Sequence, residues 1–246
     1  MQEHLHVAIH RRRPDHHYVS RVYGASAANH LDIRSLPGFG ELASAVLRDG
    51  RAMLYYDRLF TLYQAVVNAA RLAGGAPAQL IEVGVCRGGG SAFIASVMQA
   101  LRIEGTLHAF DTFEGHSGED ARIDLDAGHA TSATLFRDTS YEDVKAYLAS
   151  YPFARVHKGR FQERCAVLAD DPVLFAHLDL DIYEPTAFAL DFLRDRVLVG
   201  GAIVVDDYGF ATCPGLRQAV DEFLASAPPF FALHQLTGQC VLVKVR

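Results

Sequence analysis

The sequence predicts an α/β protein with a doubly wound sheet of seven strands that is closed by an antiparallel hairpin. Three observations lead to this prediction. From Gln79 onward, short apolar runs alternate with segments of helical periodicity, as in sheets whose parallel strands are buried on both faces. Four of these runs end in an acidic residue. The last two runs flank Thr237 and Gly238, a pattern typical of a hairpin.

The segment before the first strand, residues 1–77, is predicted to be a helical appendage that covers one end of the sheet and acts as a lid. A helical pattern begins near Phe39, and a stronger one spans residues 55–72, where apolar side chains recur at helical spacing. Glycines and a proline at 74–77 end this pattern. Residues 78–246 then form the sheet domain.

Within the sheet domain, the expected strands and helices alternate along the chain. The strands are expected at residues 80–83, 106–110, 153–157, 174–180, 201–205, 230–236 and 240–245. The helices are expected at residues 92–101, 141–149, 161–168, 186–193 and 216–224. Because the last two strands are joined by a short turn, one of them should run antiparallel to the others.

A long acidic loop, residues 112–137, follows the second strand and is expected to form a solvated lid over the site. Its acids are Glu114, Glu119, Asp120, Asp124 and Asp126.

Composition and charge exclude several classes of protein. The net charge of −6 and the absence of a long basic stretch make nucleic acid an unexpected partner. No apolar run approaches the roughly 18 residues that span a membrane, and the first ten residues lack the apolar core of a secretory signal. We therefore expect a cytoplasmic protein that acts on a small molecule. A second copy of the chain, packed against Tyr55 and Tyr56, is a further possible partner.

The cysteines and histidines do not predict a zinc site. The four cysteines are scattered and form no C-x-x-C pair, so we expect free thiols in a reducing compartment. The histidines at 4, 6, 10, 16 and 17 are interpreted as a polar tail and not as a metal site.

The glycine-rich loop after the first strand distinguishes between two nucleotide cofactors. It does not match G-x-G-x-x-G, because the glycine after Gly84 is Gly88. Glu82 lies two residues before the first glycine, where an anion would oppose the pyrophosphate of NAD. The same acid suits the cationic amino and sulfonium groups of S-adenosylmethionine. A strand–helix turn without a ligand is the alternative that this loop alone leaves open.

Acidic residues at the strand ends should converge on one edge of the sheet, since ligands of open α/β sheets bind beyond the carboxyl ends of the strands. Asp111 ends the second strand, 29 residues after Glu82. A carboxylate there accepts hydrogen bonds from ribose hydroxyls, whether the nucleoside belongs to NAD or to S-adenosylmethionine.

Three further acids predict a magnesium site. Asp179, Asp206 and Asp207 follow neighbouring strands, and carboxylate oxygens are the ligands that Mg²⁺ prefers. Zinc would normally bring histidine or cysteine ligands. His177, two residues before Asp179, is expected to have a core or supporting role and not to bind the metal. Asp181 is expected either to support the metal ligands or to cap the next helix.

Taken together, these motifs resemble those of the macrocin O-methyltransferase (TylF-type) family over roughly residues 50–225. The matching segments are residues 82–89, 110–115, 158–161, 178–186 and 200–209. The resemblance implies a class I methyltransferase (Rossmann-like) fold. It also implies S-adenosylmethionine- and Mg²⁺-dependent methylation of a hydroxyl group, often on a sugar of a natural product.

The resemblance also implies roles for individual residues. Those expected around the cofactor are Glu82, Gly84, Val85, Arg87, Gly88, Ser91, Asp111, Gly159, Phe161 and Gln162. Those expected on the metal are Asp179, Asp206 and Asp207, with Asp179 as the catalytic base. The alternatives are a catechol-type phenol as acceptor, a nicotinamide-dependent oxidoreductase, a metal-dependent hydrolase and a non-catalytic nucleoside-binding protein.

Overall fold

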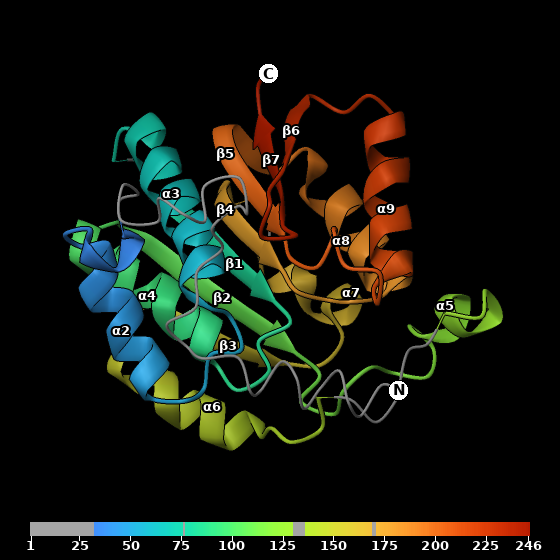
Figure 1. Ribbon diagram of the computed structural model, residues 1–246, viewed down its shortest axis with the longest axis horizontal. Coiled ribbons are helices and arrows are strands. Elements are labelled where there is room, and N and C mark those ends of the chain that lie inside the picture. Colours follow the sequence, from blue (N-terminus) through green and yellow to red (C-terminus); the bar gives the residue numbers. More distant parts are fainter. Residues whose placement is uncertain (1–31, 76, 130–135, 169–170) are drawn as a thin grey trace, which may run out of the picture.

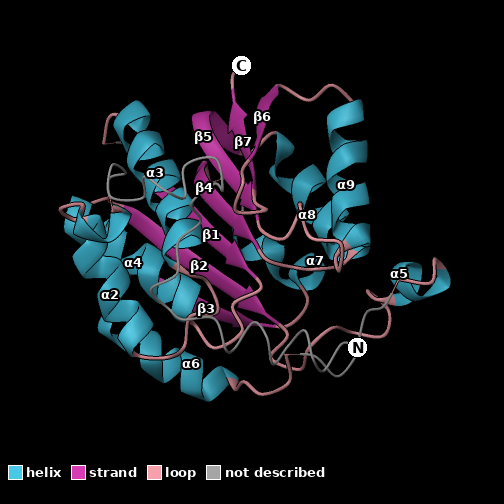
Figure 2. Ribbon diagram, viewed as in Figure 1, coloured by secondary structure: helices cyan, strands magenta, loops and turns pink. Residues whose placement is uncertain are grey.

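The computed structural model describes residues 32–75, 77–129, 136–168 and 171–246, and these form three layers (Figure 1). A central sheet lies between two groups of helices, as the colouring by secondary structure shows (Figure 2). The histidine-rich tail lies outside the described residues.

The sheet has seven strands in the order β3-β2-β1-β4-β5-β7-β6. The strands are β1 (Ala78–Val83), β2 (Gly105–Asp111), β3 (Ala154–Lys158), β4 (Val173–Leu178), β5 (Val197–Val205), β6 (Phe230–His234) and β7 (Cys240–Lys244). Strands β1 to β5 are parallel, whereas β7 runs antiparallel to both β5 and β6. The predicted doubly wound sheet with a terminal hairpin is therefore confirmed.

Helices cover both faces of this sheet. One face carries α2 (Phe39–Arg48), α3 (Tyr56–Ala73), α4 (Gly89–Leu101) and α6 (Tyr141–Tyr147), and the other carries α7 (Phe161–Arg164), α8 (Tyr183–Arg194) and α9 (Pro214–Ala225). The short α5 (Arg122–Asp126) projects from the body of the molecule in Figure 1. Short 3₁₀ turns are described at Ile33–Ser35, Leu148–Ser150 and Cys165–Leu168.

Helix α3 lies against one face of the sheet and α2 packs on α3 and α4, whereas we expected this segment to cover one end of the sheet. Helix α3 packs on β4 and β5. Phe39, Leu59 and Leu62 are fully buried in the same hydrophobic cluster as Leu80 of β1. Tyr56, expected at a subunit contact, packs edge-to-face against Phe39, with ring centroids 6.4 Å apart. The apolar stripe that predicts these helices is therefore part of the main core.

We expected the acidic loop to be solvated throughout, but two of its acids are buried. Asp124 is fully buried and accepts the Tyr183 backbone N–H at 2.9 Å, at the first turn of α8. Asp120 is 5% exposed and pairs with Arg160 and the Gln162 side chain. Asp124 thus satisfies a helix N–H that has no partner within its own helix, and the burial of Asp120 is offset by its pairing with the Arg160 guanidinium.

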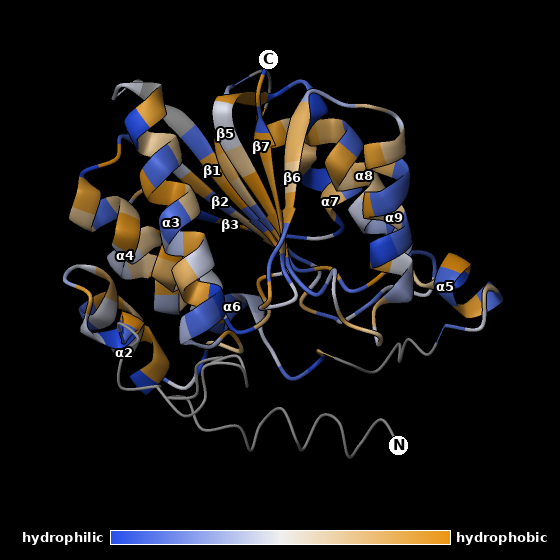
Figure 3. Cartoon of the chain, turned by 45° about the horizontal axis from the view of Figure 1, so that its top comes forward, coloured by the Kyte–Doolittle hydropathy of each residue, from blue (hydrophilic) through white to orange (hydrophobic). Residues whose placement is uncertain are grey.

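Apolar residues concentrate in the central strands, and the loops beyond their carboxyl ends are mainly polar (Figure 3). No helix in the described part of the chain is long and apolar enough to cross a membrane. All four cysteines are free, as expected.

Candidate active site at the carboxyl ends of the strands

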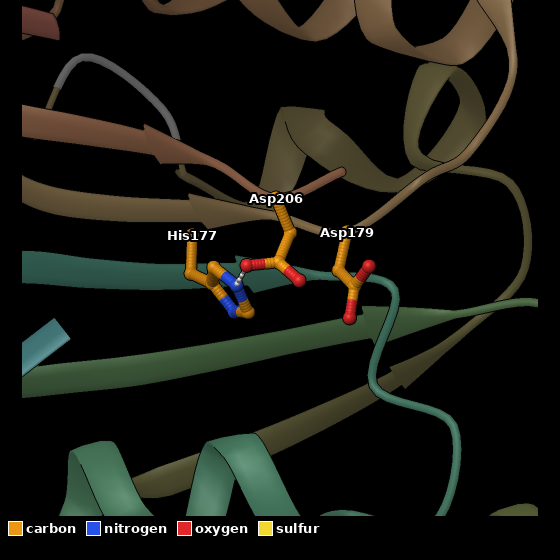
Figure 4. A group of neighbouring side chains, drawn as sticks. All are labelled: His177, Asp179 and Asp206. Carbon is orange, nitrogen blue, oxygen red and sulfur yellow. Dashed lines mark ion pairs between the residues drawn. The ribbon is translucent and has the colours of Figure 1, made fainter. Parts of the chain in front are cut away.

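Four carboxylates beyond β4 and β5 form what we call the acid cluster. Its members are Asp179, Asp181, Asp206 and Asp207. One ligand atom each from His177, Asp179 and Asp206 lie within 4.8 Å of one another (Figure 4). The same holds for ligand atoms of Asp181, Asp207 and Cys213. The structure thus groups two of the three predicted metal ligands and places Asp207 in the adjoining group.

Arg58 of α3 brings a guanidinium to this cluster. Its two terminal nitrogens form ion pairs with Asp206 and, at 2.7 Å, with Asp207. The guanidinium also lies over the Phe210 ring, 4.6 Å from its centroid. Burial lowers the pKa of Arg58, but the nearby carboxylates outweigh burial and raise it, so the group stays charged.

The acid cluster holds four carboxyl groups, which together would carry more negative charge than Arg58 and His177 balance if all four were ionised. Burial, followed by the charges of Asp206 and Asp207, raises the pKa of Asp179 well above its ordinary value. Burial raises the pKa of Asp207 to about 8, although Arg58 acts in the opposite direction. Burial also raises the pKa of Asp206, but Arg58 and His177 outweigh it and hold the pKa low. Carboxylates that retain protons because they are crowded and buried fit a divalent cation with oxygen ligands.

His177 connects the acid cluster to the first strand. It lies directly opposite Glu82 in the register of β4 and β1, and its Nδ1 is 2.9 Å from a Glu82 carboxylate oxygen. Its Nε2 is 3.7 Å from Asp206 (Figure 4). Burial lowers the pKa of His177, but the two carboxylates raise it to about 10. His177 is fully buried and lies between two carboxylates, as a core or supporting role requires, and the expectation that it does not bind the metal stays a prediction.

The glycine loop lies directly on Glu82. Ser91, in the first turn of α4, donates a hydrogen bond to the second oxygen of Glu82. A Cβ at Gly90 would collide with the Glu82 carboxylate, and a Cβ at Gly84 would collide with the backbone oxygen of Asp179. Gly84 also has φ +94°, which L side chains rarely adopt. The loop therefore needs glycine at both positions in order to lie this close to the sheet.

Two predicted cofactor residues have partners within the protein. Asp111 accepts the backbone N–H of Cys86 at 2.7 Å and that of Phe113 at 2.6 Å, so it holds the loops after β1 and β2. The side chain of Arg87 forms an ion pair with Asp138. Contacts of Asp111 and Arg87 with a cofactor stay predictions.

The segment after β3 carries the other predicted cofactor residues. Gly159 has φ +128° and donates its N–H to the Asp111 backbone oxygen at 2.9 Å. Phe161 is buried and packs edge-to-face on Phe110, with centroids 5.0 Å apart. Gln162 donates to Asp120, but its buried Oε1 has no hydrogen-bond partner among the described residues. This free acceptor fits an amino group such as that of adenine.

The remaining predicted residues, Val85 and Gly88, shape the loop. The Gly88 N–H donates to the Val85 backbone oxygen at 2.9 Å, and Gly88 precedes α4 with φ +87°.

Three residues at the site were not identified from the sequence. They are Arg58, His116 and Gln239. His116 lies 3.5 Å from Asp181 through its Nε2, and its buried Nδ1 has no partner in the described part of the chain. Gln239, in the turn before β7, donates to Asp206 at 2.6 Å. No local pattern marks any of the three, because each reaches the site from a distant segment.

Comparison with known proteins identifies a family. Residues 41–242 match the family model of macrocin-O-methyltransferase (TylF). Demethyldecarbamoylnovobiocin O-methyltransferase of Streptomyces niveus is 29% identical over 188 residues, which cover 72% of this chain and 69% of that protein.

A second relative agrees with this match, and a solved structure shares the fold. The 8-demethyl-8-(2,3-dimethoxy-alpha-L-rhamnosyl)-tetracenomycin-C 4'-O-methyltransferase of Streptomyces olivaceus is 31% identical over 161 residues, 62% of this chain and 60% of that protein. The structure of the O-methyltransferase NovP superposes with a TM-score of 0.65 at 24% identity, covering 80% of this chain and 83% of the other.

Proposed function

The chain belongs to the macrocin O-methyltransferase (TylF) family and is an O-methyltransferase, and from that premise we propose the finer function. The enzyme transfers the methyl group of S-adenosylmethionine to a sugar hydroxyl of a natural-product glycoside, with Mg²⁺ bound at the acid cluster. The rhamnosyl group in the name of one relative supports a sugar as acceptor. Membership of a methyltransferase family removes the nicotinamide-dependent oxidoreductase and the other non-methyltransferase alternatives.

One observation carries the proposal of a metal. The acid cluster adjoins the glycine loop through Glu82 and His177, and it crowds four carboxyl groups where only Arg58 and His177 supply positive charge among the described partners. The Asp179 carboxylate receives no hydrogen bond from the described residues, so it is available to a ligand. We assign Asp179, Asp206 and Asp207 to the metal, which requires Arg58 to share or release its two carboxylates.

The cofactor side of the site supports S-adenosylmethionine. The loop 84–91 approaches the sheet without side chains in the way and leads into the N-terminus of α4. The Gln162 Oε1 can accept the adenine amino group. Asp111 lies between these two points, at the end of β2, where the remaining lone pairs of its carboxylate can accept ribose hydroxyls.

The chemistry that follows is a direct methyl transfer. Mg²⁺ bound here would supply Lewis-acid activation of the acceptor hydroxyl. Asp179, in its ionised form, receives the hydroxyl proton. The oxygen–methyl bond forms as the methyl–sulfur bond breaks, and S-adenosylhomocysteine leaves. Alignment of the reacting atoms at about 3–3.5 Å is the main requirement on the protein.

The described part of the N-terminal segment, residues 32–75, supplies part of the wall of the site, and a lid role for the whole segment, residues 1–77, is part of this proposal. Ala52 lies so close to Gly89 that a Cβ there would collide with its backbone. Arg51 donates to the Arg87 backbone oxygen at 3.4 Å and pairs with Asp143 of α6 at 2.7 Å. We assign cofactor binding to the second domain, residues 78–246.

The test is a methyl-transfer assay with isotope-labelled S-adenosylmethionine and two acceptors, a rhamnosyl glycoside and catechol. We expect label on the glycoside, loss of transfer in EDTA and recovery with Mg²⁺. Label on catechol alone would replace the sugar by a phenol as acceptor. Full transfer in EDTA would overturn the metal.

A further inference from the structure

We propose that His177 is a positioning residue that transmits the placement of Asp206 to the glycine loop through Glu82. The inference rests on the proposed function, because it assumes that the loop binds S-adenosylmethionine. It goes further by stating that the acid cluster and the cofactor site act on each other through one buried side chain.

On one side of His177, Asp206 is fixed from two directions. Arg58 of α3 forms an ion pair with one carboxylate oxygen, and Gln239 donates to the other at 2.6 Å. The His177 Nε2 lies 3.7 Å from that second oxygen, which is an ion-pair distance and longer than a hydrogen bond (Figure 4). Asp206 is fully buried, so water does not take the place of these partners.

On the other side, Glu82 joins His177 to the cofactor loop. The His177 Nδ1 meets one Glu82 oxygen at 2.9 Å, and Ser91 donates to the other. A Cβ at Gly90 would strike the same carboxylate, so the loop backbone rests on it. Any turn of the Glu82 carboxylate therefore moves the first turn of α4.

The side chains that connect Asp206 to Ser91, namely His177 and Glu82, have little space in which to change conformation. Glu82, Ser91, His177 and Asp206 are each at most 2% exposed. In β1 and β4 the backbones at Glu82 and His177 are paired in register, so the two side chains cannot slide apart along the sheet. Displacement of the Asp206 carboxylate consequently moves the ring, since packed interiors deform by discrete repacking.

A double-mutant cycle on S-adenosylhomocysteine affinity tests this transmission. Binding is measured by calorimetry in EDTA, so that no metal contributes. Asp206→Asn should weaken binding by about tenfold when His177 is present, within the usual range of coupling between sites. The same change should weaken binding less than about twofold in a His177→Gln background, because the link is already broken.

A second cycle and a control keep the test decisive if His177→Gln does not fold. Asp206→Asn is combined with Ser91→Ala, which removes only the hydroxyl at the far end of this connection, and the two effects should again be non-additive. His108→Gln is the matched control, since His108 is also a buried histidine of the sheet, but its hydrogen-bond partners are His157 and Gln79 and not Glu82 or a member of the acid cluster. It should leave affinity unchanged.

The outcomes separate the two proposals. Additive effects in the cycles, or an Asp206→Asn protein that binds as tightly as the wild type, would overturn the role of His177 and leave the proposed function intact. Absence of S-adenosylhomocysteine binding by the wild-type protein would overturn the cofactor assignment and, with it, this inference.

Discussion

Replacing Arg58 by methionine removes the one arginine that pairs with Asp206 and Asp207 in the described part of the chain. The Arg58 side chain is 14% exposed, and those of Asp206 and Asp207 are 0% and 19% exposed. Methionine is similar in length, so packing against Phe210 changes little while the charge is lost. The two carboxylates would then lie side by side without their cation, and we expect the folded state to be strongly destabilised.

The size of the effect follows from burial. Removing one partner of a buried ion pair costs about 3–5 kcal/mol, and the partial exposure of Asp207 places Arg58→Met near the lower end, about 3 kcal/mol. For a chain of this length, each kcal/mol lowers the melting temperature by about 2–4 °C. The expected drop is therefore about 6–12 °C.

Calorimetric melting in EDTA measures this drop. Arg71→Met is the matched control, because Arg71 is exposed on the same helix and forms no ion pair among those described. Its unfolding free energy should change by less than about 0.5 kcal/mol. Equal melting temperatures for the two variants would show that the acid cluster does not depend on Arg58 and would refute this reasoning.

Three other predictions follow from the structure. Asp207→Asn should abolish Mg²⁺-dependent methyl transfer, because it removes a proposed metal ligand, while calorimetry shows cofactor affinity within a few fold. Gly84→Ala should lower the unfolding free energy in urea by about 2 kcal/mol or more, because a Cβ at φ +94° strikes the Asp179 backbone; an unchanged value would contradict the close approach. Burial, with the charges of His157 and Arg155, lowers the pKa of His108 to about 4. The unfolded chain thus binds a proton below about pH 6.5 that the folded chain does not bind, so stability should fall from pH 6.5 towards pH 4 by about 3 kcal/mol, and His108→Gln should remove this contribution to the slope.

Local sequence patterns predicted the sheet and its polar edge for a physical reason. A buried parallel strand must be apolar throughout, so an acid at its end is conspicuous and its position along the chain marks the edge of the sheet. Glu82 and His177 are polar residues inside such apolar runs. The two residues lie directly opposite each other in the register of β1 and β4. Neither apolar run, however, predicts that β1 and β4 are neighbours in the sheet.

Contacts between distant segments escaped the sequence analysis. Arg58 lies beside Asp57 within the helical pattern of residues 55–72, and nothing in this segment shows that its side chain reaches Asp206 and Asp207. The sequence predicts that Asp120 and Asp124 are solvated, because nothing in the acidic loop indicates that Arg160 lies next to Asp120 or that the first turn of α8 lies next to Asp124. Charge patterns report local composition, whereas these pairs depend on tertiary placement.

The partners of Asp206 set an order of events for the polypeptide as it folds. Its carboxylate is enclosed by a residue 148 positions earlier and by another 33 positions later. Both loops must close before the pocket exists, and closing long loops is the slow part of forming such a topology. Gln239 arrives only when β7 inserts between β5 and β6. In a refolding experiment, the enclosed pocket should therefore mature with the terminal hairpin, after the parallel strands have collapsed.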